Sequence, residues 1–376
     1  MKIKLVIFLY SLANWGGAEH IILKVCRYLQ NTRLYDIKII GLVDEQPSLE
    51  KDFAQLGITT KSLFYNDKKS LCLQLPTIFR LKKILKEEKP DILLNVLFPC
   101  IVLGGFIGKL AKVPIIIGNL HGPAVFKKKI AILLDRFVSR YYKGYIAVAD
   151  HIKKQFSTRE NIPENKISVI PNGIELKTLP KDFNRDNFRT EWGIGKNDIV
   201  IGTIGRTYRE KNQEYLVEIG QHLSKLFPNL KVLIVGDGPL FVSLKKKVHD
   251  LGIENICILT GWQTSPINFL SIMDLFVLPS HYEGMPCSII EAWQHKIPVA
   301  GTKVLGIQDL IKDNTTGILF PKDNPQQASD TLLALLKNRK LQDTLIINGY
   351  NQWHNKFSVE KMGNSYHNYF QNLHGQ

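Results

Sequence analysis

The sequence lacks the features that mark metal-stapled and disulfide-stapled proteins. Its five cysteines are scattered through 376 residues and form no Cys-x-x-Cys pair. No Cys/His spacing typical of a zinc site occurs either. The cysteines are Cys26, Cys72, Cys100, Cys257 and Cys287. Because each lies in or beside an apolar run, we expect reduced thiols in a cytosolic protein.

A long uninterrupted apolar run is also missing. The run LVIFLYSLA at 5–13 is followed by Trp15 and two glycines rather than by a small-residue cleavage site, which favours a buried first strand over a signal peptide. The run at 92–108 is broken by Asn95 and Pro99, and it falls short of the roughly 20 apolar residues that a membrane-spanning helix needs.

Positive charge is abundant but unevenly distributed. Residues 1–175 contain 27 Lys/Arg and 15 Asp/Glu, whereas residues 176–376 contain 22 and 19. The basic half predicts an anionic partner, such as nucleic acid, an acidic membrane surface or a phosphorylated substrate. Nucleic acid is disfavoured because aromatic residues do not interleave with the basic ones.

Short β-rich runs alternate with segments of helical period along the whole chain. Strands are expected at 4–10, 37–43, 91–97, 114–120, 145–149 and 168–172, and again at 198–206, 231–238, 256–261, 275–280 and 298–302. The polar stretch 176–197 predicts a linker with a short helix. Continuous apolar strands between helices predict two parallel sheets, which bind ligands at the carboxyl ends of their strands.

Three glycine turns follow expected strands. They contain Gly16 and Gly17, then Gly205 beside Arg206 and Lys211, then Gly236 and Gly238. Each is either a tight turn or a place where a ligand approaches the backbone. The position of Arg206 and Lys211 at a strand end favours cations that meet a diphosphate over a solvated charged loop.

Two glutamates lie close together in the segment SHYEGMPCSIIEAW. Glu283 belongs to a loop with Gly284, Met285 and Pro286, and Glu291 lies one turn into the helix that follows. An unpaired buried carboxylate is costly, so two in an apolar segment indicate a ligand rich in hydroxyl groups. The alternative is one capping carboxylate and one surface glutamate.

Two features of the first half point to further contacts. His121 follows an expected strand, where it is either structural or a contact for a transferred group. The segment that opens with 126–130 places Ile130, Leu133, Leu134, Phe137 and Val138 on one side and Lys127, Lys128, Arg136, Arg140 and Lys143 elsewhere. It predicts either contact with an anionic bilayer or an ordinary packing helix with a basic outer face.

Taken in order, these motifs resemble the retaining glycosyltransferases of family 4, which have the α/β GT-B fold. The matching segments are GGAE (16–19), VIPNGIE (169–175), IGR…EKN (204–212), VGDGP (235–239), PSHYEGMPCSIIEAW (279–293), PVAGT (298–302) and DNTTGILF (313–320). One departure lies at 304–309, where the family commonly has a glycine pair and Pro-Glu, but this chain has Gln308 and Asp309.

The resemblance implies two Rossmann-like domains that face each other across a cleft, and a role for each candidate residue. Residues 1–175 would bind the acceptor, residues 176–357 the nucleotide sugar, and 358–376 would form a helix that crosses back. Arg206 and Lys211 would neutralise the donor diphosphate, which Gly17 approaches. Glu283 and the 284–286 backbone would position the sugar, Glu291 would bind the ribose and His121 the donor sugar near the reacting carbon.

The implied reaction transfers a hexose or N-acetylhexosamine from a nucleotide sugar, preferably UDP-linked, to a lipid-linked or surface polysaccharide acceptor. It would retain the anomeric configuration and need no cofactor or metal. The protein would be cytoplasmic and bound to the inner face of an anionic membrane. The alternatives are a GDP-mannose-dependent mannosyltransferase, a nucleotide-sugar epimerase, and a non-catalytic nucleotide-sugar-binding module of a membrane assembly.

Overall fold

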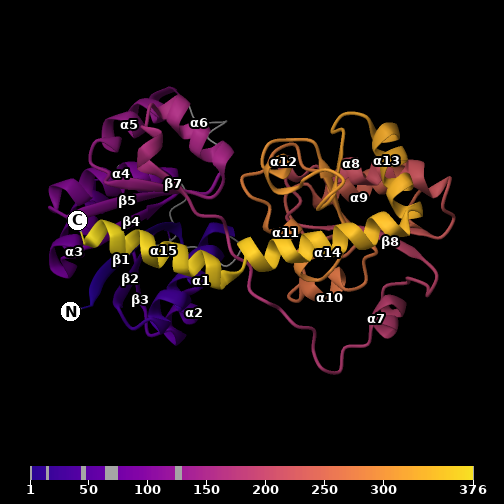
Figure 1. Ribbon diagram of the computed structural model, residues 1–376, viewed down its shortest axis with the longest axis horizontal. Helices are drawn as coiled ribbons and strands as arrows, with labels where there is room; N and C mark the ends of the chain where they lie inside the picture. Colours follow the sequence, from indigo (N-terminus) through magenta and orange to yellow (C-terminus); the bar gives the residue numbers. More distant parts are fainter. Residues whose placement is uncertain (1, 14–16, 44–47, 64–74, 123–128, 376) are drawn as a thin grey trace. The chain divides into compact units, whose positions relative to one another are not determined.

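The computed structural model describes residues 2–13, 17–43, 48–63, 75–122 and 129–375, and it divides into two compact units. Unit 1 comprises Met1–Gly173 together with Val359–Gln376, and unit 2 comprises Ile174–Ser358. Figure 1 shows one α/β sheet in each unit. The chain thus leaves unit 1 once and returns to it with its last helix.

The sheet of unit 1 has seven parallel strands in the order β3-β2-β1-β4-β5-β6-β7. They are β1 (Ile3–Ser11), β2 (Tyr35–Val43), β3 (Thr59–Ser62), β4 (Ile92–Val96), β5 (Ile115–Leu120), β6 (Gly144–Ala147) and β7 (Ile167–Val169). β4 and β5 are buried at every position, as strands covered on both faces should be. The strand order reverses between β1 and β4.

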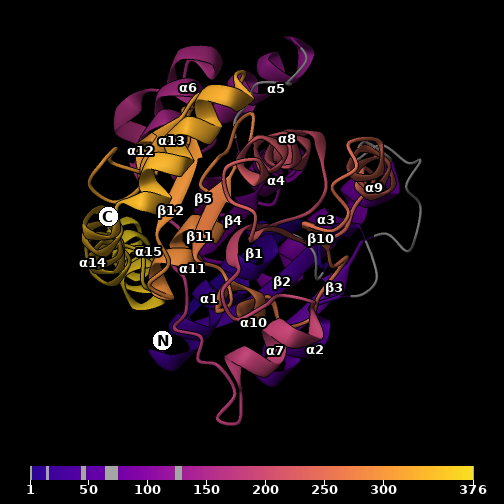
Figure 2. The ribbon, with the colours of Figure 1, turned by 90° about the vertical axis from the view of Figure 1, so that its right-hand side faces the viewer.

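Within the described residues of unit 1, seven α-helices and a short 3₁₀ turn (Glu164–Lys166) accompany this sheet. The α-helices are α1 (Gly17–Asn31), α2 (Glu50–Gln55), α3 (Leu75–Glu88), α4 (Phe98–Leu110), α5 (Lys129–Ser139), α6 (Asp150–Glu160) and α15 (Val359–His374). The last of these, α15, packs against α1, and Figures 1 and 2 show the two side by side. Tyr366 on α15 is buried and its hydroxyl lies 2.5 Å from the Asn119 Nδ2 donor at the end of β5.

Unit 2 repeats the same architecture with six parallel strands in the order β10-β9-β8-β11-β12-β13. They are β8 (Ile199–Ile204), β9 (Leu230–Val235), β10 (Cys257–Leu259), β11 (Leu275–Leu278), β12 (Val299–Thr302) and β13 (Ile318–Phe320). The helices are α7 (Arg185–Glu191), a 3₁₀ turn (Arg209–Lys211), α8 (Gln213–Ser224), α9 (Phe241–Asp250), α10 (Pro266–Leu270), α11 (Cys287–Gln294), α12 (Ile307–Leu310), α13 (Pro325–Lys337) and α14 (Arg339–Lys356).

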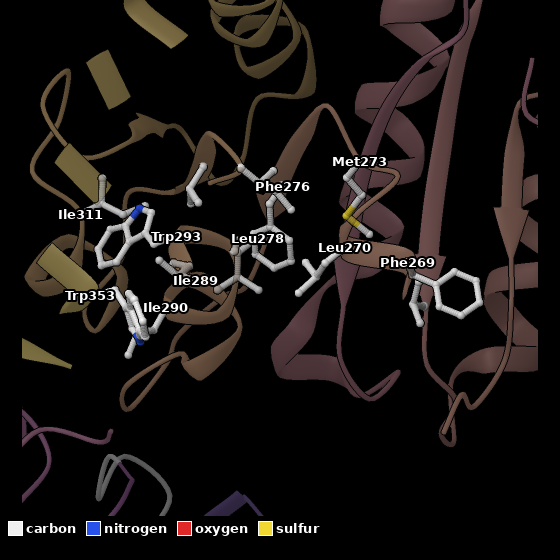
Figure 3. Packing of buried hydrophobic residues seen from close by; sticks show 14 of the residues in the cluster. Phe269, Leu270, Met273, Phe276, Leu278, Ile289, Ile290, Trp293, Ile311 and Trp353 are labelled. Carbon is white, nitrogen blue, oxygen red and sulfur yellow. The ribbon is translucent and has the colours of Figure 1, made fainter. Parts of the chain in front are cut away.

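The core beneath α11 fixes the position of the loop that precedes this helix. Figure 3 shows Trp293 of α11 near Trp353 of α14, with Phe276 of β11 farther along the same cluster. Trp293 Nε1 donates to the Thr316 carbonyl at 2.8 Å. A Cβ at Gly349 would lie 2.3 Å from the Trp293 ring, so glycine is required where α14 crosses the indole. These contacts of Trp293 fix α11 on the core of unit 2.

The expected strands and the two parallel sheets are confirmed, with differences at their ends. The apolar run at 92–108 divides into β4 and part of α4. No helix in the described part of the chain is long and apolar enough to cross a bilayer. The polar strand β3 is not anticipated by the apolar pattern, because its side chains are largely exposed. Cys26, Cys100, Cys257 and Cys287 are free thiols, and Cys72 lies outside the described residues.

Candidate functional site

The loops after β8 and β11 leave the sheet of unit 2 at its switch point. The strand order reverses between these two neighbours, which is where open parallel sheets form a ligand-binding crevice. The His281 amide of the second loop donates to the Glu210 carbonyl of the first at 2.8 Å. Residues 205–212 and 279–286 are thus joined through their backbones.

Lys211 and Glu283 form an ion pair between these loops. Lys211 Nζ donates to Glu283 Oε1 at 2.7 Å and to Oε2 at 3.0 Å. The Ser280 hydroxyl donates to Oε1 at 2.6 Å. The Glu283 side chain is only 9% exposed and Lys211 25%, so the carboxylate is the more costly charge to leave unpaired.

The loop after β12 supports the Glu283 loop from the other side. Thr302 Oγ1 donates to the Ser280 carbonyl at 2.5 Å. Gly306 has φ +85°, and a Cβ there would lie 2.3 Å from the Glu283 carbonyl oxygen. The motif departure at 304–309 therefore preserves the glycine that the close backbone approach demands. Leu305, just before it, is exposed.

The two glycine turns of unit 2 pack against each other. The Gly205 amide donates to the Val235 carbonyl at 3.0 Å, and the Gly236 amide donates to the Gly261 carbonyl at 2.9 Å. Gly236 has φ +133°, and a Cβ there would lie 2.1 Å from the Gly205 carbonyl oxygen. Gly236 is thus required by the fold itself. Gly238 lies two residues after Gly236, and its amide donates to Asp237 Oδ1 at 2.6 Å.

Arg206 differs from Lys211 in having no acidic partner among the described residues. Its guanidinium lies over the Tyr208 ring, 4.6 Å from the centroid, and the side chain is exposed. Stacking of this kind orients a guanidinium while leaving its N–H donors available to an anion. Arg206 is therefore an oriented, uncompensated cation at the switch point.

The helix α11 begins directly behind the loop of Glu283. Pro286 is its buried N-cap residue, and no side chain caps the helix. The Ile289 amide donates to the Pro286 carbonyl at 3.2 Å, which leaves the amides of Cys287 and Ser288 for a ligand. Gly284 and Met285 are half-buried, and Met285 packs against the core cluster of unit 2. Glu291 is half-buried on the second turn, and its carboxylate has no hydrogen-bond or ion-pair partner in the described part of the chain.

Unit 1 contains the remaining candidates, at the carboxyl ends of its strands. His121 directly follows β5, and its covered Nε2 has no hydrogen-bond partner within the described ranges. Burial lowers the pKa of His121 to about 4, so the imidazole is neutral at pH 7. Gly17 opens α1 and is exposed, with no described atom within 4 Å of a Cβ built on it. Gly16 lies outside the described residues.

Sequence reasoning missed three supports of this arrangement. The Ser280 hydroxyl donates to the Glu283 carboxylate, and Gln213 Nε2 donates to the Arg206 carbonyl at 3.0 Å. Thr207 is buried beneath the glycine turns, and its amide donates to the Asp237 carbonyl at 3.0 Å. Their residue types carry no signal, because only the folded loops bring their partners near.

Among the described residues, no three His, Cys, Asp or Glu side chains gather in a group that could hold a metal ion.

Two family models match the chain, one on each half. "Glycosyltransferase Family 4" matches residues 15–178, and "Glycosyl transferases group 1" matches residues 184–352. The second range contains the loops at the switch point of unit 2. The first contains Gly17 and His121.

Two curated relatives each align with about three quarters of the chain. The chain is 28% identical over 298 residues to a UDP-Gal:alpha-D-GlcNAc-diphosphoundecaprenol alpha-1,3-galactosyltransferase of Escherichia coli, covering 75% of this chain and 77% of the relative. It is 25% identical over 301 residues to the capsular polysaccharide biosynthesis glycosyltransferase CapM of Staphylococcus aureus, covering 77% and 79%.

Solved structures share the fold across both units. HepE of Anabaena, crystallised with UDP, superposes with a TM-score of 0.85 at 18% identity, covering 98% of this chain and 100% of HepE. Sucrose-phosphate synthase of Thermosynechococcus elongatus superposes with a TM-score of 0.80 at 15% identity over the whole of both chains. With its two parallel-sheet Rossmann-like domains, the chain is a glycosyltransferase of the GT-B fold and belongs to family 4.

Proposed function

We propose that this glycosyltransferase moves a hexose or N-acetylhexosamine from a UDP-linked donor to a lipid-linked or surface polysaccharide acceptor, with retention of configuration and without a metal. The observation that carries the proposal is the charge arrangement at the switch point of unit 2. A buried, ion-paired Glu283, an uncompensated Arg206 and the open N-terminus of α11 lie on two joined loops. Together they offer one fixed hydrogen-bond acceptor, the Glu283 carboxylate, and several N–H donors that can bind an anion.

The diphosphate is the part of the donor that this arrangement suits best. Arg206 supplies a planar guanidinium with free donors, and the first amides of α11 supply a helix N-terminus. Because negative charge develops on the leaving diphosphate in the transition state, fixed cations placed there lower the barrier. We therefore assign charge neutralisation to Arg206 and Lys211 in place of a divalent ion.

Glu283 is the group that we assign to the donor sugar. Its carboxylate accepts from Lys211 and Ser280, but an ionised carboxylate has about four lone-pair sites, so capacity for sugar hydroxyls remains. Glu291, with no partner among the described residues, is assigned to the ribose hydroxyls. The neutral His121 and the open Gly17 are assigned to the transferred sugar and the diphosphate, as the family resemblance implies.

Retention follows from the proposed geometry of attack. The acceptor hydroxyl would approach the anomeric carbon on the face that the diphosphate leaves, and the departing phosphate oxygen would take the acceptor proton. No second carboxylate on the opposite face is needed for this route. The UDP preference is supported by the UDP-galactose relative and by the UDP complex of HepE. With a lipid-linked acceptor and a nucleotide-sugar donor, the proposed reaction would take place at the cytoplasmic face of a membrane.

Two measurements on the purified full chain test the proposal. In a thermal-shift series, UDP at about 100 times its dissociation constant should add about 2.7 kcal/mol of stability, and GDP should add less. Radiolabelled sugar should move from the UDP-linked donor into a lipid extract in the presence of EDTA, and the Glu283→Gln variant should not transfer it. Stabilisation by GDP alone would favour the mannosyltransferase, and binding without transfer would favour the non-catalytic module.

A further inference from the structure

Helix α5 of unit 1 is amphipathic, but four of its bulky apolar side chains are exposed to solvent. Its small or polar residues Ala131 and Asp135 are buried together with Val138, at positions i, i+4 and i+7. Its bulky apolar residues face solvent instead. Ile130, Leu133, Leu134 and Phe137 are between 39% and 68% exposed. The prediction that Val138 shares their face is wrong, because Val138 turns inward with Ala131 and Asp135.

The adjacent helix α4 adds to the same kind of surface. It packs against α5 and exposes Phe106 and Leu110, at 41% and 45%, beside the exposed Lys109. Monomeric proteins rarely leave so many large apolar side chains together in water without a partner. We refer to Phe106, Leu110, Ile130, Leu133, Leu134 and Phe137 as the α4–α5 apolar surface.

Positive charge borders this surface. Residues 98–143 contain eight Lys/Arg and a single acidic residue, Asp135, which is buried. Lys129 and Lys143 are exposed at the two ends of the α5 segment. The Arg140 guanidinium lies over the Phe137 ring, 4.3 Å from its centroid, so apolar and cationic groups are presented together. Lys127 and Lys128 lie outside the described residues.

We propose that the α4–α5 apolar surface docks on an anionic lipid bilayer, with the α5 side chains among the acyl chains and the basic border among the headgroups. A second copy of this chain would bring two basic borders together, which costs electrostatic free energy. An anionic bilayer instead matches both the apolar and the cationic parts. This inference rests on the proposed lipid-linked acceptor for its purpose, because docking would bring the enzyme to the layer that holds such an acceptor.

Sedimentation with sucrose-loaded vesicles tests the inference without donor or acceptor. The full chain should bind vesicles made of equal parts phosphatidylglycerol and phosphatidylcholine, and bind pure phosphatidylcholine weakly. The double variant Leu133→Glu/Phe137→Glu should lower the partition coefficient at least about tenfold, because both side chains lose acyl contact. Lys129→Gln/Lys143→Gln should lower it roughly fivefold for each charge removed, and only on the anionic vesicles.

Ile347→Glu on α14 is the matched control, since Ile347 is 61% exposed and Leu133 60%. It should bind vesicles like the wild type, and all variants should keep the wild-type thermal shift with UDP. Equal vesicle binding by wild type and Leu133→Glu/Phe137→Glu would overturn the inference. So would a dimer in light scattering that this variant dissociates. Failure of sugar transfer with intact vesicle binding would count against the proposed function alone.

Discussion

At the scale of single residues, the Lys211–Glu283 pair predicts unequal effects of removing its two members. Lys211→Ala leaves a carboxylate that is 9% exposed with Ser280 as its remaining partner, whereas Glu283→Gln leaves a lysine that can turn toward water. We expect Lys211→Ala to destabilise unit 2 by about 1–3 kcal/mol and Glu283→Gln by less. Urea unfolding of both variants measures the difference.

A sugar-transfer assay on the same variants separates the contribution of Lys211 and Glu283 to stability from their contribution to the reaction. Both variants should lose transfer, including Glu283→Gln, which stays folded. The double variant Lys211→Met/Glu283→Gln should recover stability relative to Lys211→Ala, because no buried charge remains, yet stay inactive. Full transfer by Glu283→Gln would remove the carboxylate from the reaction.

Because burial lowers the pKa of His121, we expect the stability of unit 1 to depend on pH. Its folded pKa of about 4 lies below the ordinary value, so the unfolded chain binds the proton first as the pH falls below about 6.5. The stability contributed by the neutral ring is complete above that pH and is lost toward pH 4. At pH 5 the loss should be up to about 2 kcal/mol for unit 1.

Urea unfolding of the wild type and His121→Asn at pH 7.5 and pH 5 measures this contribution. The wild type should lose more stability than the variant on acidification. His374→Asn, at the exposed end of α15, should follow the wild type. Identical pH profiles for the wild type and His121→Asn would show that His121 titrates normally.

At the scale of elements, the two kinds of glycine turn predict opposite outcomes for the same substitution. Gly17→Ala should change stability by less than about 0.5 kcal/mol, because no described atom lies near the added Cβ. Gly236→Ala should cost about 1–3 kcal/mol or more, since it combines φ +133° with a contact of 2.1 Å to the Gly205 carbonyl. Differential scanning calorimetry compares the two variants.

The proposed role of Gly17 adds a second readout. If the donor diphosphate approaches this glycine, Gly17→Ala should weaken the thermal shift with UDP and slow transfer while the protein remains folded. A Gly17→Ala enzyme with wild-type transfer would leave Gly17 as a plain helix start.

The sequence predicted elements best where one physical signal dominates. β4 and β5 are continuous apolar runs, so burial on both faces identifies them. The apolar pattern does not reveal β3, because its side chains are largely exposed and it pairs with β2 through backbone hydrogen bonds. The amphipathic pattern of α5 was visible, but which face turns inward depends on how it packs against α4 and α6. Ser280 shows the same limit, since only folding places its hydroxyl at Glu283.

At the scale of the whole molecule, α15 makes unit 1 depend on the chain's last residues. Phe370 is fully buried in unit 1, where it packs near Tyr366 and Tyr35. The core of unit 2 is built from its own residues, among them the fully buried Phe276 of β11. Two separate cores of this size predict two cooperative unfolding transitions rather than one.

A matched pair of phenylalanine truncations assigns those transitions. Phe370→Ala and Phe276→Ala should each cost about 3–5 kcal/mol, but in different units. Phe370→Ala should lower the transition that UDP raises less, and Phe276→Ala should lower the one that UDP raises more, because most of the proposed donor contacts belong to unit 2. Scanning calorimetry with and without UDP distinguishes them. If both variants lower the same transition, the return of α15 has made the two cores unfold as one.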